Sequence, residues 1–186
     1  MHLSSSEIKK LSLLKTKHII LPKELLTTND KTLGFTMDYI DINTKQEFLK
    51  VSLSHIINEI KELESELYLL GKNNFLLEDV EPRNLFYNGK FYLFDADSFV
   101  YDEGLDYSKK NIEMFTWCFI RAIALSLNNK LSNKEQTAMV RKLHYLYTKS
   151  DYLLLSDFLK DLMQDKKLEN INNNLKIKKL IKEESF

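Results

Sequence analysis

The sequence predicts an α+β fold with a helical majority, and three observations support that prediction. Apolar residues recur at helical spacing from Leu53 to Leu70, which is typical of a long helix with one buried face. Two short aromatic-rich runs flank Asn88 and Gly89, and Asn-Gly between such runs is a strong signal for a β-hairpin. From about Lys109 onward the apolar spacing is again helical. A long helix, a hairpin and several further helices, in that order, indicate an α+β arrangement.

The first forty residues are predicted to form a helix followed by a strand pair. Serines that can cap a helix stand at positions 4–6, ahead of apolar residues at helical spacing. The apolar stretch 18–26 is expected to be extended and is interrupted at Pro22, because the residue before a proline is pushed away from helical angles. Turn-forming residues then lead into the alternating run 33–42, which predicts a strand.

The middle of the chain predicts a helix, a short apolar piece and the hairpin. Gly71 follows the long helix at the place where a terminating glycine is common. After the short apolar run 75–77, residues 84–87 and 91–94 form the two predicted strands of the hairpin.

Three helices are predicted for the rest of the chain. The first has an apolar face from Ile112 to Leu127 and is followed by a polar break at 128–136. The second is centred on 139–147, and the third begins at a cap formed by Ser150 or Ser156. The polar, Lys-rich end at 165–186 is expected to be either a peripheral helix or a tail.

Composition narrows the classes of partner. Lys plus Arg and Asp plus Glu both number 27, so the formal net charge is zero, whereas a nucleic-acid surface normally needs a basic excess. The single cysteine, Cys118, lies in an apolar run and is expected to be a buried structural thiol. The N-terminus has no apolar signal core, and the apolar run 115–127 is too short to span a bilayer. We therefore expect a cytoplasmic protein with no membrane or nucleic-acid partner.

Acidic and amide side chains gather in the segment DVEPRNLFYNGKFYLFDAD, from Asp79 to Asp97. Because a hairpin reverses the chain, Asn84 and Asp95 are expected at the same end, with their backbones on the order of 5 Å apart. Asp79 precedes Asn84 on a loop that contains Pro82 and can curl back to the same place. The alternative for these residues is a hydrated turn with capping side chains, and Asp97 is expected to be such a cap.

An Asp, an Asn and an Asp that converge form a site made only of oxygen ligands. Hard cations such as Mg²⁺ bind one or two carboxylates and complete their shell with water and phosphate oxygens. Asp79, on the loop, is then a candidate proton acceptor for a hydroxyl nucleophile. Metal ligands beside a base are the arrangement that phosphoryl transfer needs.

The same segment resembles the catalytic loop and metal-binding motif of the protein-kinase-like superfamily, which includes aminoglycoside and choline kinases. That family has Asp, four residues, Asn, a hairpin and then an Asp that opens an Asp-Phe-Gly-type motif. The resemblance implies that Asp79 is the catalytic base, that Asn84 and Asp95 bind Mg²⁺, and that ATP is the second ligand. It also allows a protein partner.

The resemblance extends along the chain in order. The run LGFTMDYID is similar to the last small-lobe strand and hinge, which implies a gatekeeper role for Met37 and backbone contacts from Asp38 and Ile40 to adenine. Asn111 is near the position of a buried Asp in the central helix, and Glu7 matches the small-lobe glutamate. Two domains are implied: residues 1–40 as a remnant of the small lobe and hinge, and residues 41–186 as a mostly helical large lobe, with 165–186 peripheral.

The sequence also departs from the family pattern. The segment before the Glu7 helix has no room for the glycine-rich loop and strand lysine that hold ATP, so the expected small lobe is truncated. Glu78 and Glu81 place negative charge near the transferred phosphate, and the metal motif has the sequence Asp-Ala-Asp. Two hypotheses follow: a phosphotransferase that is inactive alone or is a piece of a larger enzyme, and a pseudokinase-type interaction or regulatory module.

Overall fold

The computed structural model describes residues 3–29, 31–41, 48–94, 99–127 and 131–166, and the statements below concern these residues. The predicted mixture of helices and small sheets with a helical majority is confirmed. The helices and strands are α1 Ser5–Ser12, β1 Glu24–Thr28, β2 Lys31–Thr36, α2 Leu53–Lys72, β3 Phe75–Leu77, β4 Leu85–Tyr87, β5 Phe91–Leu93, β6 Phe99–Tyr101, α3 Ser108–Ser126, α4 Asn133–Lys149 and α5 Leu155–Lys166. Short 3₁₀ turns lie at Phe48–Lys50 and Pro82–Asn84.

The described strands form three antiparallel pairs: β1 with β2, β4 with β5, and β3 with β6. The predicted hairpins β1–β2 and β4–β5 are both present. Strand β6 was not predicted, because it has three residues and its partner β3 lies far back in the sequence. An isolated parallel bridge joins Ile19 to Leu93, so the segment before β1 lies against β5.

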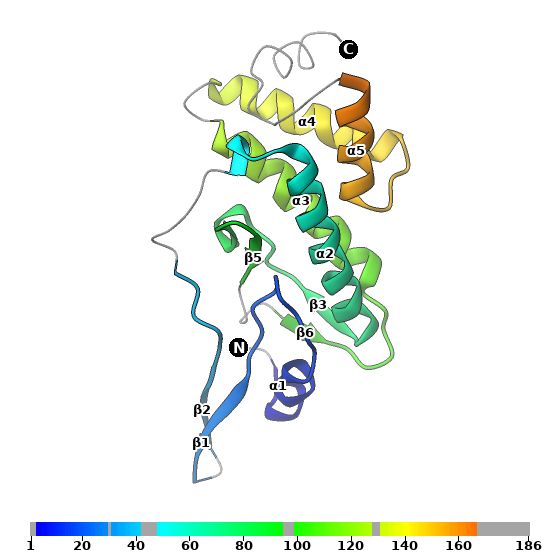
Figure 1. Cartoon of the computed structure of the whole chain (residues 1–186). Helices are drawn as coiled ribbons and strands as arrows, with labels where there is room; N and C mark the ends of the chain where they lie inside the picture. Colours follow the sequence, from blue (N-terminus) through cyan, green and yellow to red (C-terminus); the bar gives the residue numbers. More distant parts are fainter. Residues whose placement is uncertain (1–2, 30, 42–47, 95–98, 128–130, 167–186) are drawn as a thin grey trace.

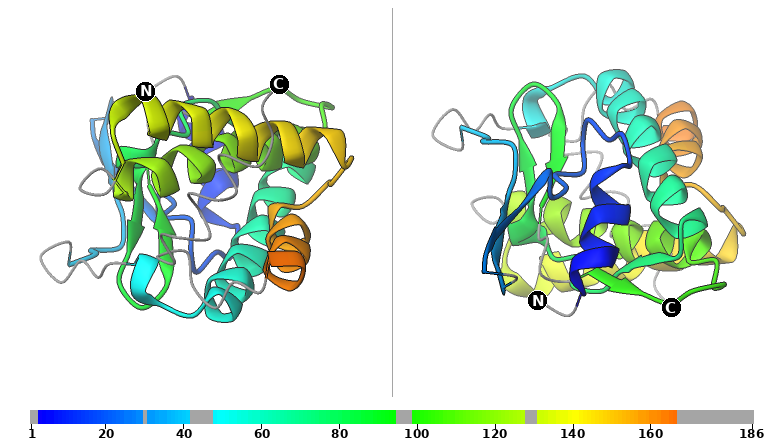
Figure 2. Two further views of the ribbon diagram at one scale, coloured as in Figure 1. Left: turned by 90° about the horizontal axis from the view of Figure 1, so that it is seen from above. Right: turned by 90° about the horizontal axis from the view of Figure 1, so that it is seen from below.

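The helices supply most of the core. Helix α2 packs against α3 and α5, and α3 packs against α4. The β1–β2 hairpin lies at one end of the molecule and α4 with α5 at the other, with α2 and α3 between them (Figure 1). Two further views show the same arrangement from above and from below (Figure 2), and α1 packs against β1. Phe75, Phe91, Phe115 and Phe119 are fully buried at the centre.

Two helices begin with the same local motif. The side chain of Ser4 accepts the N–H of Glu7, and the Glu7 carboxylate accepts the N–H of Ser4, which is a capping box. Ser132 and Glu135 form the same motif at α4. Helix α4 therefore begins at Asn133, inside the stretch that was predicted to be a polar break, because polar residues at a helix start serve as caps.

Gly71 does not end helix α2 as predicted. The helix continues to Lys72, and the residue with a positive φ after it is Asn74, at 67°. A Cβ on Gly71 would lie 2.0 Å from the backbone nitrogen of Ser108. Glycine is thus required here because the start of α3 approaches the backbone of α2 closely.

The predicted strand over residues 33–42 is shorter than expected. Strand β2 ends at Thr36, which pairs with Glu24, the first residue of β1. Pro22 lies just before β1 and has no N–H with which to extend the ladder. Residues 37–41 therefore continue without regular hydrogen bonding.

Helix α5 begins differently from either prediction. Ser150 is the C-cap residue of α4, and Ser156 is the second residue of α5 and not the residue before it. The backbone N–H groups of Leu155 and Ser156 instead donate to Oε1 of Glu64 in α2. The cap comes from another helix, so local sequence could not predict it.

The structure also bears on the predictions for Cys118 and for a membrane-spanning helix. Cys118 is buried, and burial raises the pKa of its thiol to about 12. Among the helices that the structure describes, we find none with both the length and the apolar character needed to cross a membrane.

Candidate functional site

The loop from Asp79 to Asn84 is closed by its own hydrogen bonds. The Asn84 side chain is buried, and its Nδ2 donates to the backbone oxygen of Asp79 at 3.2 Å. The backbone N–H of Asn84 donates to the oxygen of Glu81 at 2.9 Å, within a 3₁₀ turn that begins at Pro82. Proline suits the first position of such a turn because its φ is already fixed. Asp79 and Asn84 thus lie next to each other, joined through the backbone oxygen of Asp79.

The hairpin brings the far end of β5 to the same place. Leu85 pairs with Leu93, and the N–H of Phe94 donates to the backbone oxygen of Asn84 at 3.1 Å. Gly89 in the turn has a φ of 78°, a backbone conformation that residues with a side chain rarely adopt. Asp79, Asn84 and Phe94 are therefore linked through Asn84 at one end of the hairpin.

Asp95 follows Phe94 in the chain, but Asp95 and Asp97 lie outside the described residues. Over the part of the chain that is described, no group of three or more His, Cys, Asp or Glu residues is placed to hold a metal ion. The predicted metal ligands therefore reduce, within the described residues, to the amide of Asn84.

The carboxylate of Asp79 is half-exposed and is paired with Arg83. Nη2 of Arg83 lies 3.3 Å from Oδ2 of Asp79, and its Nε lies 3.6 Å from Oε2 of Glu81. The guanidinium offsets two of the negative charges around the loop. Arg83 is largely exposed and both carboxylates are partly exposed, so the two ion pairs contribute little to the stability of the fold.

Asn111 anchors the chain just before this loop. Its side chain is fully buried, Oδ1 accepts the N–H of Leu77 at 2.9 Å, and Nδ2 donates to the oxygen of Phe75 at 2.9 Å. Nδ2 also lies 3.3 Å from the oxygen of Leu67 in α2. One amide thus joins α2, α3 and β3, and β3 leads directly into Asp79.

Two of the three predicted adenine contacts, Asp38 and Ile40, line one groove. Met37 is exposed, while Asp38 and Ile40 line a groove of about 710 Å³ together with residues 14–17, residues 19–24 and the β5 hairpin. Asp79 and Asn84 are not among the residues that line it.

Asp38 makes an ion pair with Lys23 within this groove. Glu7, which matches the small-lobe glutamate, caps helix α1. Oδ1 of Asp38 lies 2.5 Å from Nζ of Lys23, and both side chains are more than half exposed. The carboxylate of Glu7 closes the cap of α1 through the N–H of Ser4 at 2.6 Å.

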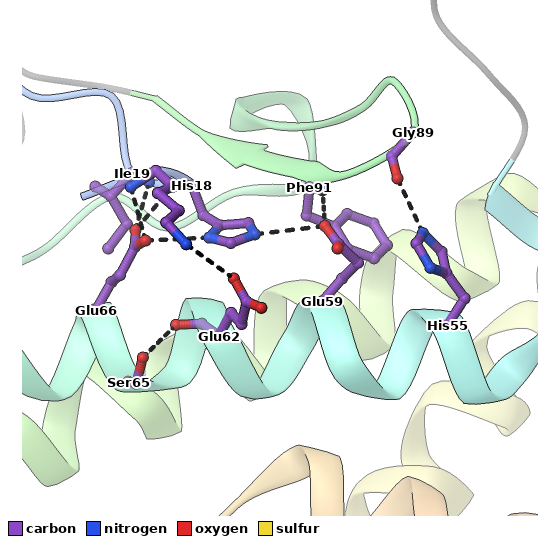
Figure 3. A network of polar contacts seen from close by, with 10 residues as sticks. His18, Ile19, His55, Glu59, Glu62, Ser65, Glu66, Gly89 and Phe91 are labelled. Carbon is purple, nitrogen blue, oxygen red and sulfur yellow. Dashed lines mark hydrogen bonds and ion pairs between the residues drawn. The ribbon is translucent and has the colours of Figure 1, made fainter.

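Sequence reasoning missed a buried contact between a histidine and two acids. His18 is 1% exposed and lies between two carboxylates of α2, those of Glu59 and Glu66 (Figure 3). The available signal was Glu66 itself, an acid among the apolar positions of an amphipathic helix, where an unpaired charge is costly.

Comparisons with known proteins add no family assignment: no family model matches the chain, and no curated protein matches it significantly. Function is therefore inferred from the residues of the chain.

Proposed function

We propose that the chain carries the base and metal positions of an ATP-dependent phosphotransferase, with Asp79 as the base and Asn84 and Asp95 as ligands of Mg²⁺. The observation that carries the proposal is the hydrogen-bonded junction of Asp79, Asn84 and Phe94 at one end of the β4–β5 hairpin. An extended, unordered loop would leave these residues independent of one another. The anchoring of β3 by Asn111 supports the same arrangement.

The donor chemistry of these residues fits a hard cation. A carboxamide and a carboxylate offer oxygen ligands, which Mg²⁺ prefers to nitrogen and sulfur. Bound Mg²⁺–ATP would supply the phosphoryl group and the positive charge that stabilises it during transfer. Among the protein groups, Asn84 and Asp95 would hold the metal, and Asp79 would accept the proton of the attacking hydroxyl.

A second candidate function is a kinase-like interaction module without catalysis. The ion pairs of Arg83 with Asp79 and Glu81 favour it, because the carboxylate proposed as the base is already engaged. In this alternative the loop and hairpin have a structural role only. Binding of nucleotide and transfer of phosphate separate the two candidates.

The binding test is a thermal-shift titration with ATP in the presence and absence of Mg²⁺. The phosphotransferase proposal expects stabilisation that needs both ligands, because a ligand that binds only the folded state raises the melting temperature. Asp95→Asn is expected to abolish the Mg²⁺-dependent part. Asp151→Asn, at an exposed aspartate with a positive φ that asparagine also tolerates, is the matched control and is expected to respond like the wild type.

The catalytic test follows release of ADP with and without candidate hydroxyl acceptors. Asp79→Asn is expected to retain Mg²⁺–ATP binding and to lose on the order of 10²-fold or more in turnover, the usual contribution of a positioned base. Binding without turnover in the wild type would favour the interaction module. Absence of any Mg²⁺-dependent shift at millimolar ATP would reject the nucleotide site.

A further inference from the structure

His18 lies in a closed polar cluster with two glutamates of helix α2, which we call the His18 cluster: His18, Glu59 and Glu66. Nδ1 of His18 donates to Oε1 of Glu66 at 3.1 Å, and Nε2 lies 3.4 Å from Oε2 of Glu59 (Figure 3). The imidazole is almost completely buried, and both carboxylates are largely shielded from water. Each ring nitrogen therefore faces a negative oxygen.

This geometry favours the imidazolium form. A neutral imidazole carries one N–H and can donate to one carboxylate only, while its other nitrogen presents a lone pair. In the His18 cluster that lone pair would face the second carboxylate in a shielded environment, where like partial charges repel strongly. Loss of the proton thus turns one of the two attractive contacts into a repulsive one.

The cluster holds the backbone of the segment as well as its side chain. The carboxylate of Glu66 accepts the backbone N–H groups of Lys17, His18 and Ile19 at 2.7–3.0 Å. Burial raises the pKa of Glu66, but its hydrogen bond with His18 and these three N–H groups outweigh burial and lower it. Glu66 is therefore the fixed charged side of the contact.

The same contacts extend to strand β5. The N–H of Leu93 donates to the oxygen of His18 at 2.7 Å, and the N–H of Ile20 donates to the oxygen of Leu93 at 2.9 Å. Oε2 of Glu59 also lies 3.3 Å from the N–H of Phe91. Movement of Glu59 away from a neutral His18 would thus weaken the contact of Glu59 with the Phe91 N–H in β5.

An exposed ion pair of Lys17 with Glu62, at 3.8 Å, lies beside the cluster. On β4, burial and the charge of Glu59 raise the pKa of the Tyr87 phenol. Strand β5 contributes backbone groups to the contacts named above. Burial lowers the pKa of His18, but the hydrogen bond and charge of Glu66, followed by the charge of Glu59, outweigh burial and raise it above the ordinary 6.5. A histidine whose pKa is raised by folding stabilises the fold fully below the unfolded value and loses that contribution as the pH rises through the folded value.

We propose that His18 is a protonation-dependent clamp that, as an imidazolium between Glu59 and Glu66, fixes segment 17–20 to helix α2 and strand β5 and loosens when it loses its proton. The clamp holds between the low pH at which Glu66 becomes protonated and the pH at which His18 becomes neutral. It goes beyond the proposed function and stands whether or not the chain binds nucleotide.

The direct test is an NMR titration of the His18 ring. We expect its midpoint above 6.5, and we expect Glu59→Gln to lower that midpoint while leaving the hydrogen bond to Glu66 in place. The amide protection of Ile20 and Leu93, corrected for intrinsic exchange, is expected to fall at least about threefold as His18 becomes neutral, without an equal fall across α3. A midpoint at or below 6.5 in the wild type overturns the proposal.

The second test compares melting temperatures over pH. His18→Gln is expected to lower the melting temperature by at least about 4 °C near pH 6, and by less than half of that well above the midpoint of the wild-type His18 titration, because the clamp has by then released in the wild type. His55→Gln is the matched control. His55 lies on α2, as Glu59 and Glu66 do, and contacts the backbone oxygen of Gly89 at 2.9 Å, outside the His18 cluster (Figure 3). It is expected to keep the pH dependence of the wild type.

If His18→Gln does not fold, Glu59→Gln replaces it in the same comparison, because a glutamine can still accept the N–H of Phe91. Glu59→Gln is expected to flatten the pH dependence of the melting temperature from about pH 6 to well above the midpoint of the wild-type His18 titration. A melting-temperature difference that is constant over this range, for either variant, would mean that the cluster is structural and not protonation-dependent.

Discussion

Two buried glutamates on helix α2, Glu64 and Glu66, hold opposite sides of the protein by different means. Glu66 faces the N-terminal segment and accepts three backbone N–H groups and the ring of His18. Glu64 faces helix α5 and accepts the N–H groups of Leu155 and Ser156 and the hydroxyl of Ser156, the last at 2.5 Å. Both are buried, but only Glu66 contacts a group that can carry positive charge.

The difference appears in the direction of their pKa shifts. Burial raises the pKa of Glu64, the hydrogen bonds from Ser156 and Leu155 do not outweigh burial, and the charge of Asp157 raises it further. The pKa of Glu66 is lowered, because His18 and the backbone donors outweigh burial. The comparison teaches that neutral donors can order a buried carboxylate, whereas a facing cation keeps it ionised.

The largest expected effect is that of Glu66→Ala. The change leaves His18 and three backbone donors without their acceptor, and removal of one partner of a buried charged pair costs about 3–5 kcal/mol. Denaturant unfolding followed by circular dichroism measures the free energy of unfolding. A loss below about 1 kcal/mol, the range of exposed pairs, would mean that the N-terminal segment is not held by this carboxylate.

Gly71→Ala tests the close approach of α2 to the backbone at the start of α3, where no side chain can move aside. The new Cβ would lie 2.0 Å from the nitrogen of Ser108 and 2.2 Å from its Cα, so α2 and α3 must separate. We expect a loss of about 3 kcal/mol, at the upper end for overpacking, because backbone atoms cannot move aside singly. Gly34→Ala is the control, since a Cβ on Gly34 would have no other atom within 4 Å.

Glu64→Ala is expected to cost about 2 kcal/mol, because it leaves the first N–H groups of α5 without an acceptor but removes no facing cation. The loss should appear first as increased amide exchange in α5. Equal exchange in α5 and in segment 17–20 would show that the two carboxylates do not act on separate sides of the protein.

The conservative pair Glu64→Gln and Glu66→Gln sharpens the comparison through pH. The raised pKa of Glu64 means that its stabilisation is present below the ordinary 4.5 and is lost as the pH rises through its folded value. The lowered pKa of Glu66 means that its stabilisation is present above 4.5 and is lost as the pH falls. From about pH 3.5 to pH 6, the melting temperature of Glu64→Gln should therefore rise relative to wild type, and that of Glu66→Gln should fall. Parallel trends would contradict the assignment.

The smallest effect is expected for Asp38→Asn, which breaks an ion pair with Lys23 at the surface. Both side chains are more than half exposed, so the pair should contribute less than about 1 kcal/mol despite its short distance. Chemical denaturation at low and high salt measures it. A larger loss would mean that the segment after β2 is held more firmly than its exposure indicates.

The parts of the fold that the sequence predicts are those set by neighbours along the chain. Helix α2, the cap serines of α1 and the turn at Gly89 each follow from a local pattern, and so does the meeting of Asp79 with Asn84. The missed features depend on distant partners. Glu64 caps a helix 91 residues away, and Glu66 binds a histidine 48 residues away. No local pattern encodes such pairs.

The central claim, that Asp79, Asn84 and Asp95 gather around one nucleotide-bound cation, is tested most directly by replacing Mg²⁺ with paramagnetic Mn²⁺ in the presence of ATP and recording the amide NMR spectrum. The proposal predicts selective broadening of the resonances of Asp79, Asn84 and Phe94, and its loss in Asp95→Asn. Broadening centred on another surface of the protein, or none at millimolar ATP, would contradict the claim.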